Sequence, residues 1–121
     1  MAPFEATTSD ESGRVRVALA GECDLAVAER LDDALRAAVR RSPLVVVDLA
    51  KLDFLDSSGV HGLVTAHHAA LERGGRVHVV NATGPVAGVL DLTGVAALLS
   101  PSADGDGRAA PADGDGRGPS A

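Results

Sequence analysis

The chain has 121 residues, which fits one domain, and its 11 Lys and Arg against 17 Asp and Glu give a net charge of −6. This balance argues against nucleic acid and against an anionic membrane surface as partners, because both require clustered basic side chains. The single cysteine, Cys23, excludes an internal disulfide and indicates a reducing cytoplasm. No apolar run is long enough for a membrane span, and residues 1–12 lack the features of a signal peptide.

Composition divides the chain near residue 101. Residues 101–121 contain no Val, Leu, Ile, Phe or Met, and they repeat the sequence Ala-Asp-Gly-Asp-Gly-Arg. Such a segment cannot bury enough apolar surface to offset the entropy lost on ordering. The repeat also fails as a calcium loop, because Arg108 stands where a ligand is needed. We therefore expect one folded domain over residues 1–100 and a disordered tail over residues 101–121.

Apolar periodicity predicts the elements of the first half of the domain. Residues 14–19 alternate between apolar and polar or small side chains, which is typical of a half-buried strand, and residues 4–8 are expected to pair with it across a turn at 9–13. Asp24 is the predicted N-cap of a helix that carries apolar residues at helical spacing as far as Val39. Pro43 ends that helix.

The second half predicts alternating strands and helices. Residues 44–49 are nearly all apolar, as in a parallel strand covered on both faces. A helix with an apolar stripe from Val60 to Leu71 follows, then a strand at 76–80 and a short helix at 86–92. Residues 95–99 are expected to form a last short strand or packed coil. The fold class is therefore α/β, a single domain with a sheet of about four to five mostly parallel strands and helices packed against it.

Parallel strands place their carboxyl ends at one edge of the sheet, where open α/β sheets usually carry their sites. Three segments are therefore predicted to be neighbours: Asp24, the loop 51–58 and residues 81–83. The loop contains two serines, Ser57 and Ser58, at the start of a helix. One of them is expected to be the N-cap, and the other would be a small exposed hydroxyl at the positive end of the helix dipole, where a phosphoryl group is favoured.

The sequence Asp56-Ser57-Ser58-Gly59-Val60 after a buried strand resembles the signature of STAS domains, the anti-sigma-factor antagonists of bacterial partner-switching systems. Two other segments agree with this resemblance, Gly-Glu-Cys-Asp at 21–24 and Val-Leu-Asp-Leu-Thr-Gly at 89–94. Together the three motifs cover residues 15 to about 99.

The resemblance implies a function. The hydroxyl residue that follows the Asp, here Ser57, would be phosphorylated by a serine-kinase anti-sigma factor, and a separate serine phosphatase would reset it. The unphosphorylated form would bind the anti-sigma factor and so free a sigma factor. The implied partner-binding residues are Asp24, Asp56, Ser57, Ser58, Gly59 and His61. No cofactor, metal or catalytic activity is implied.

The chain departs from the family pattern at Cys23, where an aliphatic residue is usual, and at His61, where a Gly or a small or basic residue is common. Family members also usually close with a C-terminal amphipathic helix, whereas here the Pro- and Gly-rich tail begins.

Other functions have weaker support in the sequence. The four histidines lack the spacing of a helical zinc site, since Thr65 stands four residues after His61. A hydrolase that uses Ser57 would need an adjacent oriented base, and there is no Gly-x-Ser-x-Gly elbow. The alternative to a switch is a STAS-type scaffold that is never phosphorylated.

Overall fold

The computed structural model describes residues 3–101 and contains four strands and four α-helices within that range. The described elements follow in chain order: β1 (Glu5–Glu11), β2 (Arg14–Cys23), the 3-10 turn η1 (Leu25–Val27), α1 (Ala28–Arg41), β3 (Leu44–Leu55), α2 (Ser57–Glu72), β4 (Arg76–Val80), α3 (Gly84–Leu92) and α4 (Val95–Leu99). Disorder is expected over residues 101–121, and of these residues 102–121 lie outside the described range. Within residues 3–101 no helix is long and apolar enough to cross a bilayer.

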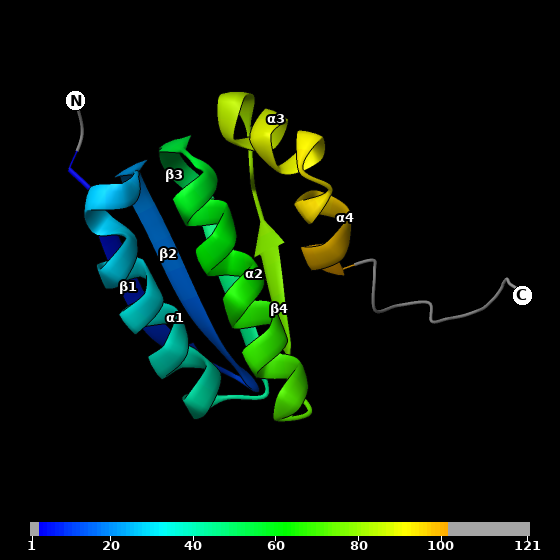
Figure 1. The fold of residues 1–121 in the computed structure, drawn as a ribbon. Helices are drawn as coiled ribbons and strands as arrows, with labels where there is room; N and C mark the ends of the chain where they lie inside the picture. Colours follow the sequence, from blue (N-terminus) through cyan, green and yellow to red (C-terminus); the bar gives the residue numbers. More distant parts are fainter. Residues whose placement is uncertain (1–2, 102–121) are drawn as a thin grey trace, which may run out of the picture.

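The four strands form one sheet in the order β1-β2-β3-β4. β1 is antiparallel to β2, whereas β2, β3 and β4 are parallel to one another. Helices α1 and α2 lie side by side on one face of this sheet, and α3 and α4 lie beyond β4 (Figure 1). The predicted fold class is therefore confirmed, with four strands of which three are parallel.

The core lies between the sheet and the two long helices. Alternate residues of β2 are buried, and the apolar face of α1 packs on them through Leu31, Leu35 and Val39. Both arginines in the last turn of α1, Arg40 and Arg41, stand at the negative end of the helix dipole. Leu71, expected in the apolar stripe of α2, has a side chain that is 40% exposed.

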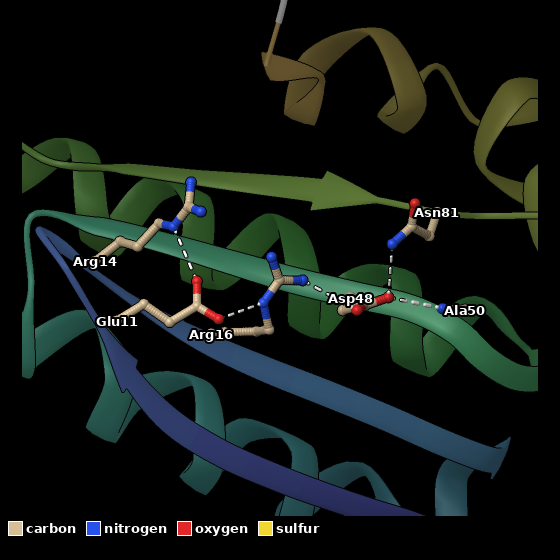
Figure 2. Close-up of polar contacts among 6 residues, drawn as sticks. All are labelled: Glu11, Arg14, Arg16, Asp48, Ala50 and Asn81. Atoms are coloured by element: carbon tan, nitrogen blue, oxygen red, sulfur yellow. Dashed lines mark hydrogen bonds and ion pairs between the residues drawn. The ribbon is translucent and has the colours of Figure 1, made fainter.

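The opposite face of the sheet carries a polar network instead of helices (Figure 2). Arg16 donates to Glu11 at 2.8 Å and to Asp48 at 3.0 Å, and the Asn81 amide donates to Asp48 at 3.1 Å. These contacts join the end of β1 to the end of β4. The pKa of Glu11 is lowered, first by its hydrogen bond to Arg16, and the pKa of Asp48 is lowered, first by the Ala50 backbone N–H.

The strands are longer than the sequence predicted. β2 continues to Cys23 and β3 to Leu55, so the expected loop 51–58 is wrong over residues 51–55. β1 likewise runs to Glu11, which shortens the expected turn at 9–13. The two long parallel strands remain paired beyond Ala18 by means of two register shifts. The burial alternation of β2 continues to Cys23, whereas β3 shows no regular alternation after Leu49, and its second half is therefore not indicated as strand by the sequence pattern.

The last expected strand is also wrong. Residues 95–99 form the helix α4, in which Val95 and Leu99 are buried. Gly94, with φ of +76°, ends α3 and turns the chain into α4. A short helix therefore stands where the sequence indicated a short strand or packed coil, directly before the expected start of the tail at residue 101.

Candidate functional site

The adjacent ends of β2 and β3 bring the two predicted acidic residues to the same edge of the sheet. Cys23 pairs with Leu55 in the parallel register, and the Asp56 backbone N–H donates to the Cys23 carbonyl at 3.2 Å. Asp24 and Asp56 therefore follow neighbouring strand ends directly. Their juxtaposition is the one that the parallel-sheet argument predicted, and it places Ser57 at the same edge as Asp24.

Residues 81–83 are also expected at this edge, and the structure places them elsewhere. β4 ends at Val80, which pairs with Asp48, whereas β3 continues as far as Leu55. The Asn81 side chain accordingly contacts Asp48 and not Asp24 or Asp56 (Figure 2). The unequal strand lengths separate this segment from the other two along the sheet.

The cap of α2 is Asp56, which corrects the expectation that a serine fills this role. Its carboxylate accepts from the backbone N–H groups of Ser58 at 3.0 Å and Gly59 at 3.3 Å, and from the Ser58 hydroxyl at 2.5 Å. The pKa of Asp56 is lowered, first by the Ser58 hydroxyl, with further contributions from the N–H groups of Gly59, Ser58 and Leu25. These donors stabilise the ionised carboxylate, so a fixed negative charge stands beside the serines.

The two serines occupy different environments. Ser58 is partly buried and its hydroxyl is committed to Asp56. Ser57 is exposed at the first position of α2, and within residues 3–101 its side chain makes no hydrogen bond. Its hydroxyl therefore stands in solvent at the positive end of the helix dipole.

A tightly packed layer lies beneath the serines. Gly59 is buried, and a Cβ at that position would lie 2.4 Å from Leu55 Cδ1 and 3.0 Å from Cys23 Sγ. Burial, together with the charges of Asp56 and Asp24, raises the pKa of the Cys23 thiol to about 11. Cys23 is thus a protonated packing residue, and Gly59 acts from below the surface by allowing α2 to approach the strand ends.

Asp24 repeats the same capping chemistry one strand away. Its carboxylate accepts from the Ala26 N–H at 3.0 Å and begins η1, which leads into α1. The next residue, Leu25, is 75% exposed, and Phe54 near the end of β3 is 45% exposed. These two apolar side chains border the site and were missed from the sequence. Leu25 could have been noticed because it falls outside the helical spacing of the buried residues after it.

The histidines do not form a metal centre in the described part of the chain, where no group of three or more His, Cys, Asp or Glu side chains could hold an ion. His61 is exposed one helical turn after Ser57, His67 is buried, and His68 is exposed with its ring in contact with that of His67. His61 is therefore exposed one helical turn from Ser57, and its role in partner binding stays a prediction.

Comparisons with known proteins show the family and agree with the fold. A model of the family described as "Mlab, STAS domain" matches residues 6–100. An anti-sigma factor antagonist from Mycobacterium paratuberculosis superposes with a TM-score of 0.71 at 30% identity, over 82% of this chain and 84% of its own. An antisigma-factor antagonist STAS domain from Rhodobacter sphaeroides gives 0.53 at 26% identity, over 64% and 86%.

The Bacillus cell fate determinant SpoIIAA, in its phosphorylated form, superposes with a TM-score of 0.63 at 20% identity, over 81% of this chain and 88% of its own, which shows a shared fold. No curated protein sequence matches the chain significantly.

Proposed function

The chain belongs to the STAS domain family, and from that premise we propose that it is an anti-sigma factor antagonist whose binding is switched off by phosphorylation of Ser57. The unphosphorylated protein binds a serine-kinase anti-sigma factor and so frees a sigma factor for transcription. Phosphate transfer to Ser57 releases the complex, and a serine phosphatase restores the binding form. The protein itself is a regulator and not an enzyme.

The observation that carries the proposal is the difference between the two serines. Ser57 presents an exposed hydroxyl without a hydrogen bond in the described part of the chain, whereas the Ser58 hydroxyl is bonded to Asp56. A kinase needs a hydroxyl that can enter its active site and accept a phosphoryl group. Ser57 meets that requirement, and Ser58 would first have to break the cap of α2.

The same geometry explains how a phosphate would act as a switch. Phosphorylation adds a charge of about −1.5 to −2 and three acceptor oxygens. The N-terminus of α2 stabilises this group locally, so the fold survives. In a fitted interface the phosphate must be desolvated next to the carboxylates of Asp24 and Asp56, and a loss of about 3 kcal/mol would weaken binding more than a hundredfold.

The partner surface around Ser57 combines two kinds of side chain. The carboxylates of Asp24 and Asp56 favour a basic partner group, and the exposed side chains of Leu25 and His61 supply contact area beside them. The other two residues named from the sequence support this surface indirectly. Ser58 donates its hydroxyl to the Asp56 cap, and Gly59 allows α2 to pack closely on Leu55 and Cys23.

The test combines phosphate mapping with binding. The protein is incubated with ATP and candidate anti-sigma factor kinases, intact mass is recorded, and peptide mass locates the phosphate. Ser57→Ala is expected to bind the kinase and to accept no phosphate, whereas Ser58→Ala still accepts it. Ser57→Asp is expected to fold normally and to bind poorly.

Two outcomes would contradict the proposal. Phosphate found on Ser58 alone would show that the proposal names the wrong serine as the phosphorylated residue. Stable binding of an anti-sigma factor with no phosphate transfer from any kinase tested would favour the unphosphorylated scaffold instead. Equal affinity of wild type and Ser57→Asp carries less weight, because an aspartate reproduces only part of the charge and size of a phosphate.

A further inference from the structure

Arginines gather at the end of the sheet opposite Ser57, although the protein as a whole is acidic. Of the nine Lys and Arg residues within residues 3–101, five stand at the amino ends of the parallel strands or in the helix ends beside them. They are Arg14 at the start of β2, Arg40 and Arg41 in the last turn of α1, Arg73 after α2, and Arg76 at the start of β4. The crossover topology causes this gathering, because it returns both helix C-termini to the strand starts.

A hollow of about 190 Å³ opens between these helix ends. Pro43 and Gly75 form one side of it, where the Arg76 N–H donates to the Pro43 carbonyl at 2.7 Å. A Cβ on Gly75 would lie 2.4 Å from that carbonyl oxygen, so glycine is needed for β4 to start this close. The complete lining is Val39, Arg40, Arg41, Ser42, Pro43, Ala70, Arg73 and Gly75.

The carboxylates that reach this end from β1 are already engaged. Asp10 is paired with Arg41, and Glu11 is paired with Arg14 and Arg16. In the described part of the chain the guanidinium groups of the two other lining arginines, Arg40 and Arg73, have neither an ion pair nor a hydrogen bond. Two arginines without an ion-pair partner thus line the hollow, one in the last turn of α1 and one directly after α2.

The remaining lining groups extend this chemistry. Ser42 Oγ accepts from the Leu44 N–H at 3.2 Å, which leaves the hydroxyl hydrogen free to donate. Val39 and Ala70 are buried and contribute apolar atoms to the hollow. Two guanidinium groups and a hydroxyl donor match the acceptor oxygens and double charge of a phosphoryl group, and the apolar atoms match a short organic body.

We propose that this hollow, the arginine site, binds the phosphate group of a small organic phosphate through Arg40, Arg73 and the Ser42 hydroxyl. The helix ends do not assist, because α1 and α2 direct the negative ends of their dipoles here. Affinity therefore depends on the arginine side chains and disappears with them. The site lies at the other end of the sheet from Ser57 and goes beyond the switch proposed there.

The probe is phenyl phosphate, with inorganic phosphate as the second arm. Each is titrated into the full chain at constant ionic strength while backbone amide resonances are followed by NMR. Saturable shifts are expected in residues 40–42 and 73–75, with phenyl phosphate binding the tighter of the two. Arg40→Gln/Arg73→Gln should weaken binding by at least about tenfold, since two charge-assisted contacts are lost.

Arg36→Gln is the matched control. Like the single variant Arg40→Gln it removes one charge from α1, but Arg36 is paired with Asp32 and does not line the hollow. Its affinity should stay within about twofold of wild type. All three arginines are exposed, so each variant should fold, and the single variants Arg40→Gln and Arg73→Gln provide a second comparison.

Shifts that do not saturate, or equal affinity in the double variant and wild type, would overturn the arginine site. Tighter binding of inorganic phosphate than of phenyl phosphate would overturn the assignment to an organic phosphate. Neither outcome bears on Ser57, because no kinase or protein partner takes part in the measurement.

Discussion

Two helix starts stand side by side at the carboxyl edge of the sheet, one at Asp24 and one at Asp56. Both begin directly after a strand, and both use an aspartate whose carboxylate accepts from the N–H two residues on, at 3.0 Å in each case. The two starts differ in the residues after the cap. Asp24 is succeeded by the exposed Leu25, whereas Asp56 is succeeded by Ser57 and Ser58.

The difference shows how one capping device can serve two purposes. Because an aspartate supplies the cap, neither serine is needed for it. Ser58 then strengthens the cap through its hydroxyl, and Ser57 remains free at the surface. A serine in the capping position would have consumed the hydroxyl that the proposed switch requires. The Asp24 start has no such hydroxyl and contributes charge and an apolar side chain.

The largest effect on this arrangement is expected from Gly59→Ala, which alters the contact between the two helix starts. The new methyl group would meet buried Leu55 and Cys23, so the free energy of unfolding should fall by about 1–3 kcal/mol. Gly88→Ala is the control, because no atom lies within 4 Å of the position that its Cβ would take, and the change should stabilise α3 by up to about 1 kcal/mol. Urea denaturation of both variants measures the difference, and equal stabilities would refute the packing role of Gly59.

Removing each cap in turn should give the next largest effects. Asp56→Ala is expected to cost about 1–2 kcal/mol and Asp24→Ala about 1 kcal/mol, because Asp56 accepts from three donors and Asp24 from one. Thermal unfolding ranks the two, and the opposite order would show that the caps are not distinguished by their hydrogen bonds. Under the proposed function, Asp24→Ala also weakens binding to the anti-sigma factor, measured by titration.

Ser58→Ala should act through the ionisation of Asp56. With the hydroxyl gone, the lowered pKa of Asp56 rises toward its usual value, and stability at neutral pH falls by about 0.5–1 kcal/mol, limited by solvent screening. A carboxyl whose pKa is lowered on folding contributes its full stabilisation at pH values above its pKa in the unfolded chain, which is about 4. This contribution is lost as the pH falls through the pKa of the folded protein.

The difference between wild type and Ser58→Ala should therefore shrink in acid. Carbon-13 NMR titration of the Asp56 carboxyl measures the shift, and unfolding at pH 7 and in acid measures the linkage. Ser57→Ala is the matched control, since its hydroxyl makes no bond to Asp56 in the described structure. An unchanged Asp56 pKa in Ser58→Ala would contradict the contact.

The smallest effect is expected from truncation after Ser100. Both helix starts lie within residues 24–59, and the removed segment contains no apolar residue larger than alanine or proline. The melting temperature and partner binding should stay nearly unchanged. A large fall in melting temperature would mean that the domain boundary proposed near residue 101 is wrong.

The order of strands and helices as far as α3, the buried face of α1 and the cap at Asp24 could be predicted from the amino-acid sequence. These features are local, because burial on one face imposes a period of 2 or 3.6 residues and a cap needs only a few neighbouring backbone groups. The meeting of Asp24 with Asp56 could also be predicted, since parallel strands must end at one edge.

Other features depend on contacts between segments that are distant in the chain. The extension of β3 to Leu55 depends on β2 as its partner across two register shifts, and such pairing leaves no simple alternation in the sequence. The different roles of Asp56, Ser57 and Ser58 depend on the residue at which β3 ends. The first residue after the strand, Asp56, is still extended and therefore becomes the cap of α2. The arginine site likewise depends on the fact that α1 and α2 both end at the same end of the sheet. The local sequence pattern of either helix does not show that their ends lie close together.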